Sequence, residues 1–112
     1  MELKVNDDWF RLHGWHLDEF TGIPVDIGSY RGMESSRDVK EWTKWFNEAF
    51  IRVTYFKTTR TSTKTGEVVE VKELNSIYAT GNGFHIDRNY SGNEITIQML
   101  ELITGLVCDY AK

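Results

Sequence analysis

Residues 51–61 read Ile-Arg-Val-Thr-Tyr-Phe-Lys-Thr-Thr-Arg-Thr, a run rich in β-branched and aromatic side chains. Within it Ile51, Val53 and Tyr55 occupy every second position. This alternation is typical of a strand that buries one face and exposes the other. The run therefore predicts a strand at the centre of the fold.

The turn after this strand predicts its partner and their register. Residues 64–66 read Lys-Thr-Gly, and Gly66 can supply the left-handed residue of a three-residue hairpin loop. The second strand then covers 68–80, with apolar residues opposite apolar ones and opposite charges facing each other. The predicted pairs are Val53 with Ile77, Ile51 with Ala79, Lys57 with Glu73 and Arg60 with Glu70.

A second turn signal lies at Gly81-Asn82-Gly83. Asn-Gly is a strong marker of a two-residue hairpin turn, and here it sets Ala79 opposite Ile86. The sequence thus predicts a three-stranded antiparallel meander with strands at 51–61, 68–80 and 84–90.

Two helices are expected on either side of the meander. In residues 36–50 Ser36 resembles an N-cap, and Val39, Trp42, Phe46 and Phe50 follow helical spacing. In residues 93–110 an apolar stripe runs from Ile95 to Tyr110, and Ser91 with Glu94 fits a capping box.

The N-terminal third suggests a further hairpin, with strands at 9–17 and 22–28 and a turn at 18–22. Gly14 sits where the alternation slips, and Pro24 indicates that its strand lies at an edge of the sheet or leaves residue 24 unpaired. The chain as a whole, residues 1–112, reads as a single α+β domain. The expected order is β-β-α-β-β-β-α, with both helices packed on one face of an antiparallel sheet.

The composition of the chain argues against several classes of protein. The 112 residues carry a net charge of −4, which argues against bulk binding of DNA through its phosphates. With one cysteine, Cys108, the chain has no internal disulfide, and its start lacks a signal-peptide pattern. No apolar run has the length of a membrane span. A cytoplasmic location with no membrane partner is therefore expected.

Few residues suggest catalysis or metal binding. His13 and His16 lie three apart, but the pattern of a catalytic zinc site is absent. His85 and Asp87 share one predicted strand face, yet no nucleophile can be placed beside them. Cys108 lies near the negative end of the last helix, which suits packing better than reactivity. We expect no enzyme activity, no cofactor and no metal.

The sheet face opposite the core is the most informative surface. Aromatic and basic side chains alternate on it, as on surfaces that hold a nucleic acid or anchor a protein. Either the N-terminal hairpin covers this face or a partner does. The Trp-rich segment offers a second surface. The expected interface residues are Arg52, Phe56, Arg60, Lys72, Tyr78, Trp42 and Trp45.

The sequence favours a small acidic binding protein without enzymatic activity, which acts through a protein–protein interface. Its size and charge suit an inhibitor from a phage or mobile element that antagonises a host defence nuclease or another macromolecule. The first alternative is a single-stranded nucleic-acid-binding module that uses the basic and aromatic sheet face. The second alternative is a small hydrolase centred on His85 and Asp87.

Overall fold

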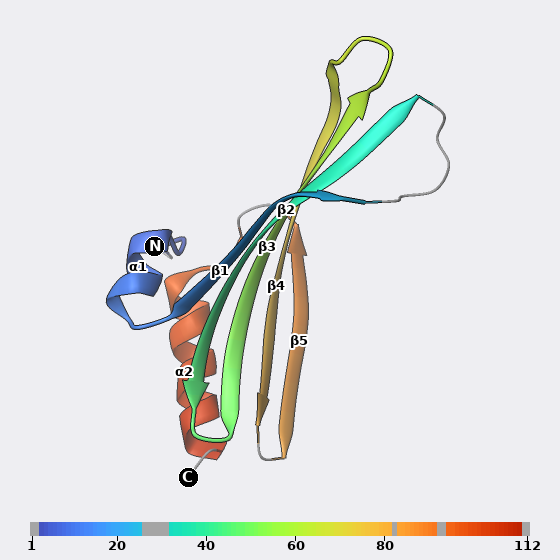
Figure 1. The fold of residues 1–112 in the computed structure, drawn as a ribbon. Coiled ribbons are helices and arrows are strands. Elements are labelled where there is room, and N and C mark those ends of the chain that lie inside the picture. Colours follow the sequence, from blue (N-terminus) through green and yellow to red (C-terminus); the bar gives the residue numbers. More distant parts are fainter. Residues whose placement is uncertain (1–2, 26–31, 82, 92–93, 111–112) are drawn as a thin grey trace.

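The computed structural model describes residues 3–25, 32–81, 83–91 and 94–110. They form a five-stranded antiparallel sheet in the order β1-β2-β3-β4-β5, with one helix before it and one after it (Figure 1). The elements are α1 (Asp7–Leu12), β1 (His16–Pro24), β2 (Met33–Phe46), β3 (Ala49–Ser62), β4 (Val68–Gly81), β5 (Phe84–Ser91) and α2 (Ile97–Tyr110). The predicted combination of an antiparallel sheet with two helices is confirmed, but the order of elements is α-β-β-β-β-β-α.

The predicted meander is confirmed as β3, β4 and β5. Val53 pairs with Ile77 and Ile51 with Ala79, and the charged pairs Lys57–Glu73 and Arg60–Glu70 also face each other. Ala79 lies opposite Ile86, as the Asn-Gly turn predicts. The turn residue Asn82 itself lies outside the described residues. Gly66 adopts the predicted left-handed φ of 74°, but the three-residue loop is wrong, because the register shifts after Arg60 and sets Thr61 opposite Val68.

The predicted helix at 36–50 is wrong, because these residues form most of β2 and the start of β3. Trp42 and Phe46 are four residues apart, and a spacing of four keeps two side chains on one face of a helix and of a strand alike. The deciding factor is the partner strand, since all of β2 pairs with β3, from Met33 opposite Ser62 to Phe46 opposite Ala49. Such pairing satisfies backbone groups that the sequence pattern does not report.

The predicted N-terminal hairpin is also wrong in its first strand and in its turn. Residues 7–12 form α1, and the side chain of Asn6 caps it by accepting a hydrogen bond from the Trp9 backbone N–H at 2.9 Å. The predicted turn at 18–22 lies within β1, which ends at Pro24. The placement of Pro24 on an edge strand is confirmed, because β1 forms one edge of the sheet. Residues 26–28 of the second predicted strand lie outside the described residues.

The C-terminal helix begins later than predicted. Ser91 ends β5, so it does not form the capping box; instead the Thr96 hydroxyl accepts from the Met99 N–H at 3.2 Å. The buried stripe is shifted as well. Leu100 and Val107 are buried, whereas Leu102, which the predicted stripe placed inside, is 68% exposed.

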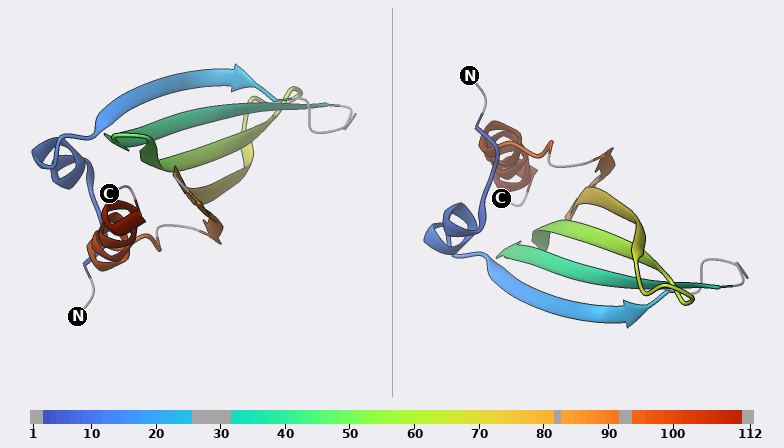
Figure 2. Two further views of the ribbon diagram at one scale, coloured as in Figure 1. Left: turned by 90° about the horizontal axis from the view of Figure 1, so that it is seen from below. Right: turned by 90° about the horizontal axis from the view of Figure 1, so that it is seen from above.

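The core lies between one face of the sheet and the helices. Ile51 and Ile77 are fully buried on this inner face, together with Phe10 of α1 and Leu100 of α2. Figure 2 shows both helices on the same side of the sheet. None of the helices in the described ranges is long and apolar enough to span a membrane.

The sheet extends well beyond its helices. The upper parts of β2 (Met33–Asp38), β3 (Lys57–Ser62) and β4 (Val68–Glu73) project past α1, α2 and the end of β5 (Figure 1). We call these three segments the arm and the rest of the molecule the body. The arm gives the molecule its elongated dimensions of 56 × 31 × 20 Å.

Candidate binding surface

The outer face of the sheet, which points away from α1 and α2, is open. β1 extends the sheet at its edge instead of folding over this face, so of the two alternatives left open by the sequence, covering by the N-terminal segment does not occur among the described residues (Figure 2). The exposed side chains of β3, β4 and β5 on this face therefore remain available to a partner. Two clusters of residues stand out on it.

The first cluster lines a hollow of about 350 Å³ on the arm. Strand pairing creates it, because Phe56 lies opposite Leu74 and Arg60 lies opposite Glu70. We call it the basic hollow, since three of its side chains are cations and one is an anion. Its residues are Arg37, Phe56, Thr58, Arg60, Glu70, Lys72 and Leu74.

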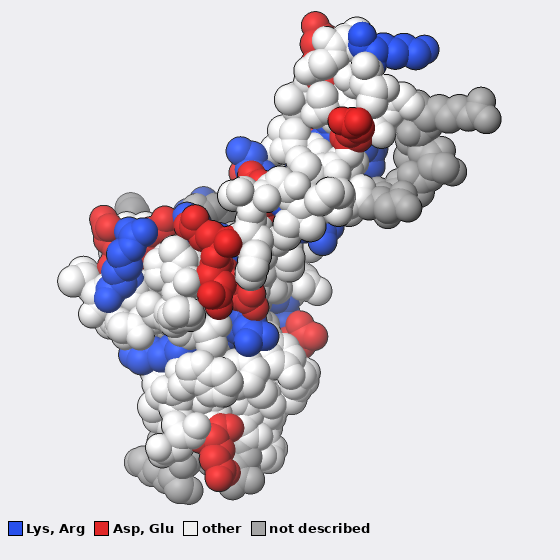
Figure 3. Space-filling view, viewed as in Figure 1, with Lys and Arg blue, Asp and Glu red and all other residues white. Residues whose placement is uncertain are grey.

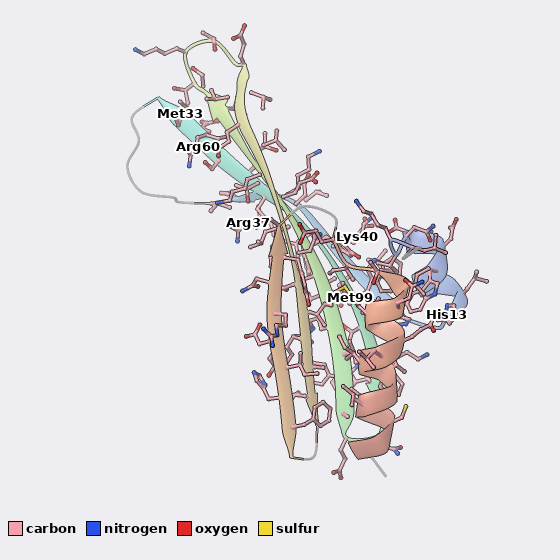
Figure 4. All side chains as sticks on the ribbon, turned by 180° about the vertical axis from the view of Figure 1, so that it is seen from behind. His13, Met33, Arg37, Lys40, Arg60 and Met99 are labelled. Carbon is pink, nitrogen blue, oxygen red and sulfur yellow. The ribbon has the colours of Figure 1, made fainter. Side chains whose placement is uncertain are left out.

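Contacts inside the basic hollow hold two of its cations in place. The Arg37 guanidinium lies over the Phe56 ring, 5.2 Å from its centroid, and its Nε donates to the Thr58 hydroxyl at 3.2 Å. Arg60 forms an ion pair with Glu70 at 3.2 Å. Arg37 and Arg60 both come from the arm, whereas Lys40 lies beside the helices (Figure 4). The hollow thus has an apolar floor at Phe56 and positive charge at its rim.

Sequence reasoning found Phe56, Arg60 and Lys72 of this hollow but missed Arg37. Arg37 was assigned to a helix at 36–50, and only its pairing with Thr58 across β2 and β3 brings it to the outer face. If residues 36–46 had been recognised as a strand, the alternation of faces along it would have placed Arg37 on the outer face.

The second cluster is aromatic and lies lower on the outer face. Trp45 is 64% exposed and its ring lies 4.8 Å from that of Phe50. The series continues to Tyr78 at 5.7 Å from Phe50, and then to His85 at 5.1 Å from Tyr78. We call these four residues the aromatic cluster. A large exposed aromatic group of this kind is a common anchor in protein interfaces.

Arg52 links the aromatic cluster to the middle of the sheet. Its guanidinium lies 5.1 Å from the Phe50 ring centroid, and its Nε is 2.8 Å from a Glu41 carboxylate oxygen. One row of the sheet, Thr54 opposite Ser76, separates Arg52 from Phe56 of the basic hollow. Six of the seven predicted interface residues therefore share one face: Trp45, Arg52, Phe56, Arg60, Lys72 and Tyr78.

The structure separates the two tryptophans that sequence reasoning grouped together. Trp42 is 1% exposed and stacks on Phe10 at 4.8 Å, so it belongs to the core and is not available to a partner. Trp45 points to the opposite side of the sheet, because residues three apart in a strand lie on different faces.

The histidines occupy simple surface environments. His13 stacks on Trp9 at 4.3 Å, and its Nδ1 lies 2.7 Å from the Trp9 carbonyl oxygen. His16 lies 3.3 Å from Asp18. Within the part of the chain that the structure describes, no three His, Cys, Asp or Glu side chains group as metal ligands would. His85 contacts the Tyr78 ring and makes no hydrogen bond with Asp87 there.

A second hollow, of about 450 Å³, lies where the arm meets the body, beside α1 and β1. Lys40 lies 2.8 Å from Asp7 and 3.7 Å from Glu19 there, and the lining as a whole carries four acidic and two basic side chains. Figure 3 shows charged side chains of both signs gathered over this middle part of the molecule. Tyr55 is one of the residues that line this hollow, but its hydroxyl is inaccessible to solvent and has no hydrogen-bond partner among the described residues.

Comparison with protein-family models, with curated proteins and with solved structures finds no match for this chain. Its function is therefore inferred from its own surface.

Proposed function

We propose that this chain is a binding protein that holds a protein partner on the outer face of its sheet. The basic hollow is the observation that carries the proposal. It combines an apolar floor with a cationic rim, and it has a shape and volume suited to one or two side chains. An acidic segment that also bears an apolar or aromatic side chain fits this chemistry.

The balance of charge favours a protein over a nucleic acid. Two of the arginines on this face are already engaged, Arg52 with Glu41 and Arg60 with Glu70. The chain as a whole carries a net charge of −4, which repels a phosphate backbone at long range. The aromatic cluster adds an anchor of the kind that protein interfaces use.

The expected role as an inhibitor belongs to this proposal. A small protein that occupies a surface of a larger one blocks whatever that surface does. A host defence nuclease remains our proposed type of target, and an acidic segment of that nuclease would be the part that the basic hollow holds.

The test begins by capturing partners with the wild-type chain and with variants of the outer face. Phe56→Ala and Arg37→Ala remove the floor and one rim cation of the basic hollow. Lys64→Ala, at the exposed tip of the β3–β4 loop, is the matched control. Each of the first two variants should weaken the identified partner's binding by roughly thirtyfold, as loss of an interface anchor does, while Lys64→Ala binds like wild type.

Titrations at several salt concentrations then separate the two classes of partner. A protein that docks on Phe56 and the aromatic cluster should bind with weak salt dependence. A single-stranded oligonucleotide held by about four basic side chains should show a log–log slope near −3. Tight oligonucleotide binding with that slope would establish the nucleic-acid alternative, and wild-type binding by both hollow variants would exclude this face as the site.

A further inference from the structure

The arm leaves one side of β4 without a neighbouring strand. β5 pairs only with the lower part of β4, ending with Ser91 opposite Leu74. Val68–Glu73 therefore lie beside β3 on one side, with a bulge at Val69 where the register shifts, and have no strand on the other among the described residues (Figure 1). This segment is a free sheet edge, which we call the β4 edge.

The β4 edge exposes three valines. Val68, Val69 and Val71 are 58%, 53% and 49% exposed. A free edge presents backbone N–H and C=O groups that can pair with another strand, and proteins commonly protect such edges with charges or proline. The β4 edge has no proline, and its charges, Glu70, Lys72 and Glu73, do not share one sign.

The order of these side chains makes the edge complementary to itself. In an antiparallel pair related by a two-fold axis at Val71, each Val71 faces the other copy's Val71. Glu70 of each copy then faces Lys72 of the other. Both contacts stabilise a cross-strand pair.

Other registers are unfavourable. Moving the axis to Glu70 pairs Val69 with Val71 but sets Glu70 against its own copy and leaves Lys72 opposite Val68, and moving it to Lys72 sets Lys72 against its own copy. A shift by a single residue would pair side chains that point to opposite faces of the sheet. The register about Val71 therefore combines an apolar centre with two attractive charge pairs, and it sets Val69 opposite Glu73 at each end.

We infer that the β4 edge is a dimerisation surface, where two copies of this chain pair their β4 strands antiparallel about Val71. The pairing runs over residues 69–73 of each copy, since Leu74 already pairs with β5. The contact is short, so the dimer is a weak one that forms in the micromolar range or above. Because the two-fold axis is perpendicular to the sheet, both basic hollows come to lie side by side on one surface.

Sedimentation velocity from low micromolar to near-millimolar protein tests this inference. The wild-type chain should shift from monomer to dimer as its concentration rises. Lys72→Glu and Glu70→Lys should each weaken dimerisation by roughly tenfold or more, because each replaces two attractive pairs with two repulsive ones. Glu70→Lys also removes the ion pair with Arg60, so weaker dimerisation by this variant alone is less specific evidence.

Mixing the two variants supplies the specific measurement. In a mixed pair every residue 70 faces a residue 72 of opposite charge, so an equimolar mixture should form a heterodimer although neither variant dimerises well alone. A misfolded variant would not be rescued in this way.

A thiol crosslinking experiment reports the register independently. In a Cys108→Ser background, Val71→Cys should be joined to its own copy by a short bifunctional maleimide. Thr59→Cys, which lies next to Val71 on β3 but away from the edge, should not. A wild-type chain that stays monomeric at the highest concentration, or a dimer that Lys72→Glu leaves intact, would overturn the inference. Phe56→Ala should dimerise normally, so this outcome is separate from that of the proposed function.

Discussion

At the scale of single residues, Tyr55 carries the most unusual environment. Its ring packs near Phe10, but its buried hydroxyl has no hydrogen-bond partner among the described residues. Burial, and to a smaller extent the negative charge of Asp7, raise the pKa of this phenol well above its ordinary value of 10.0. A buried donor without a partner costs about 1–3 kcal/mol of stability, so this residue is a weak point of the fold.

Replacing Tyr55 by Phe should therefore raise the free energy of unfolding by about 1 kcal/mol at neutral pH. The pKa is raised in the fold, so the phenol stays protonated there while the unfolded chain ionises above pH 10. The wild-type protein should thus lose stability as the pH rises through that range, and Tyr55→Phe should lose less.

Urea denaturation at neutral pH and again about one unit above pH 10 measures both effects. Tyr78→Phe, the same change on the outer face, is the matched control. An equal loss of stability in wild type and Tyr55→Phe at high pH would contradict the assigned environment.

At the scale of elements, the turn between β2 and β3 decides the architecture. Phe46 faces Ala49 across it, so Asn47 and Glu48 form a two-residue hairpin turn. Asn47 has a φ of 55°, a left-handed conformation that only Gly and, to a lesser extent, Asn and Asp adopt readily. This turn brings the whole of β2 beside β3 and carries Arg37 to the basic hollow.

The effect of a substitution at Asn47 on stability should depend on how readily the new residue adopts a positive φ. Asn47→Gly should leave stability unchanged or raise it slightly. Asn47→Val should lower the free energy of unfolding by about 1–2 kcal/mol, because a β-branched residue is strained at this φ.

Thermal and chemical denaturation of the two variants provide the measurement. Glu48→Val, at the neighbouring exposed position, is the control and should change stability by less than about 0.5 kcal/mol. Equal tolerance of valine at both positions would contradict the turn.

At the scale of the whole molecule, the body and the arm differ in what holds them together. In the body Ile51, Val53 and Ile77 are fully buried beneath the helices. In the arm no described helix covers either face, and Val69 and Val71 are largely exposed. Strands with little buried apolar surface open at lower free energy than strands of the core.

Hydrogen exchange measured on dilute protein should therefore differ between the two parts of β3, one in the body and one in the arm. Backbone amides at Ile51–Val53 should exchange slowly, while those at Thr58–Thr61 in the arm should exchange much faster. β3 provides its own control, since both segments pair with strands on both sides. Equal protection along β3 would show that the arm is held by more than its strand pairing.

The sequence by itself determined the part of the fold whose contacts are local. Turn chemistry at Gly66 and at Gly81-Asn82-Gly83, together with matching side chains on adjacent strands, was enough to give the meander and its register. The outer face and its residues Arg52, Phe56, Arg60, Lys72 and Tyr78 followed from that register.

Only the tertiary structure decided the rest. Trp42 and Phe46 fit a helix and a strand equally well, and long-range pairing with β3 selected the strand. That choice placed Trp42 in the core and Trp45 and Arg37 on the outer face. The open β4 edge has a separate origin, since it depends on how far β5 extends along β4. Periodicity reports which residues share a face, but only the hydrogen-bonding partner of each strand determines which face is covered and which edge is free.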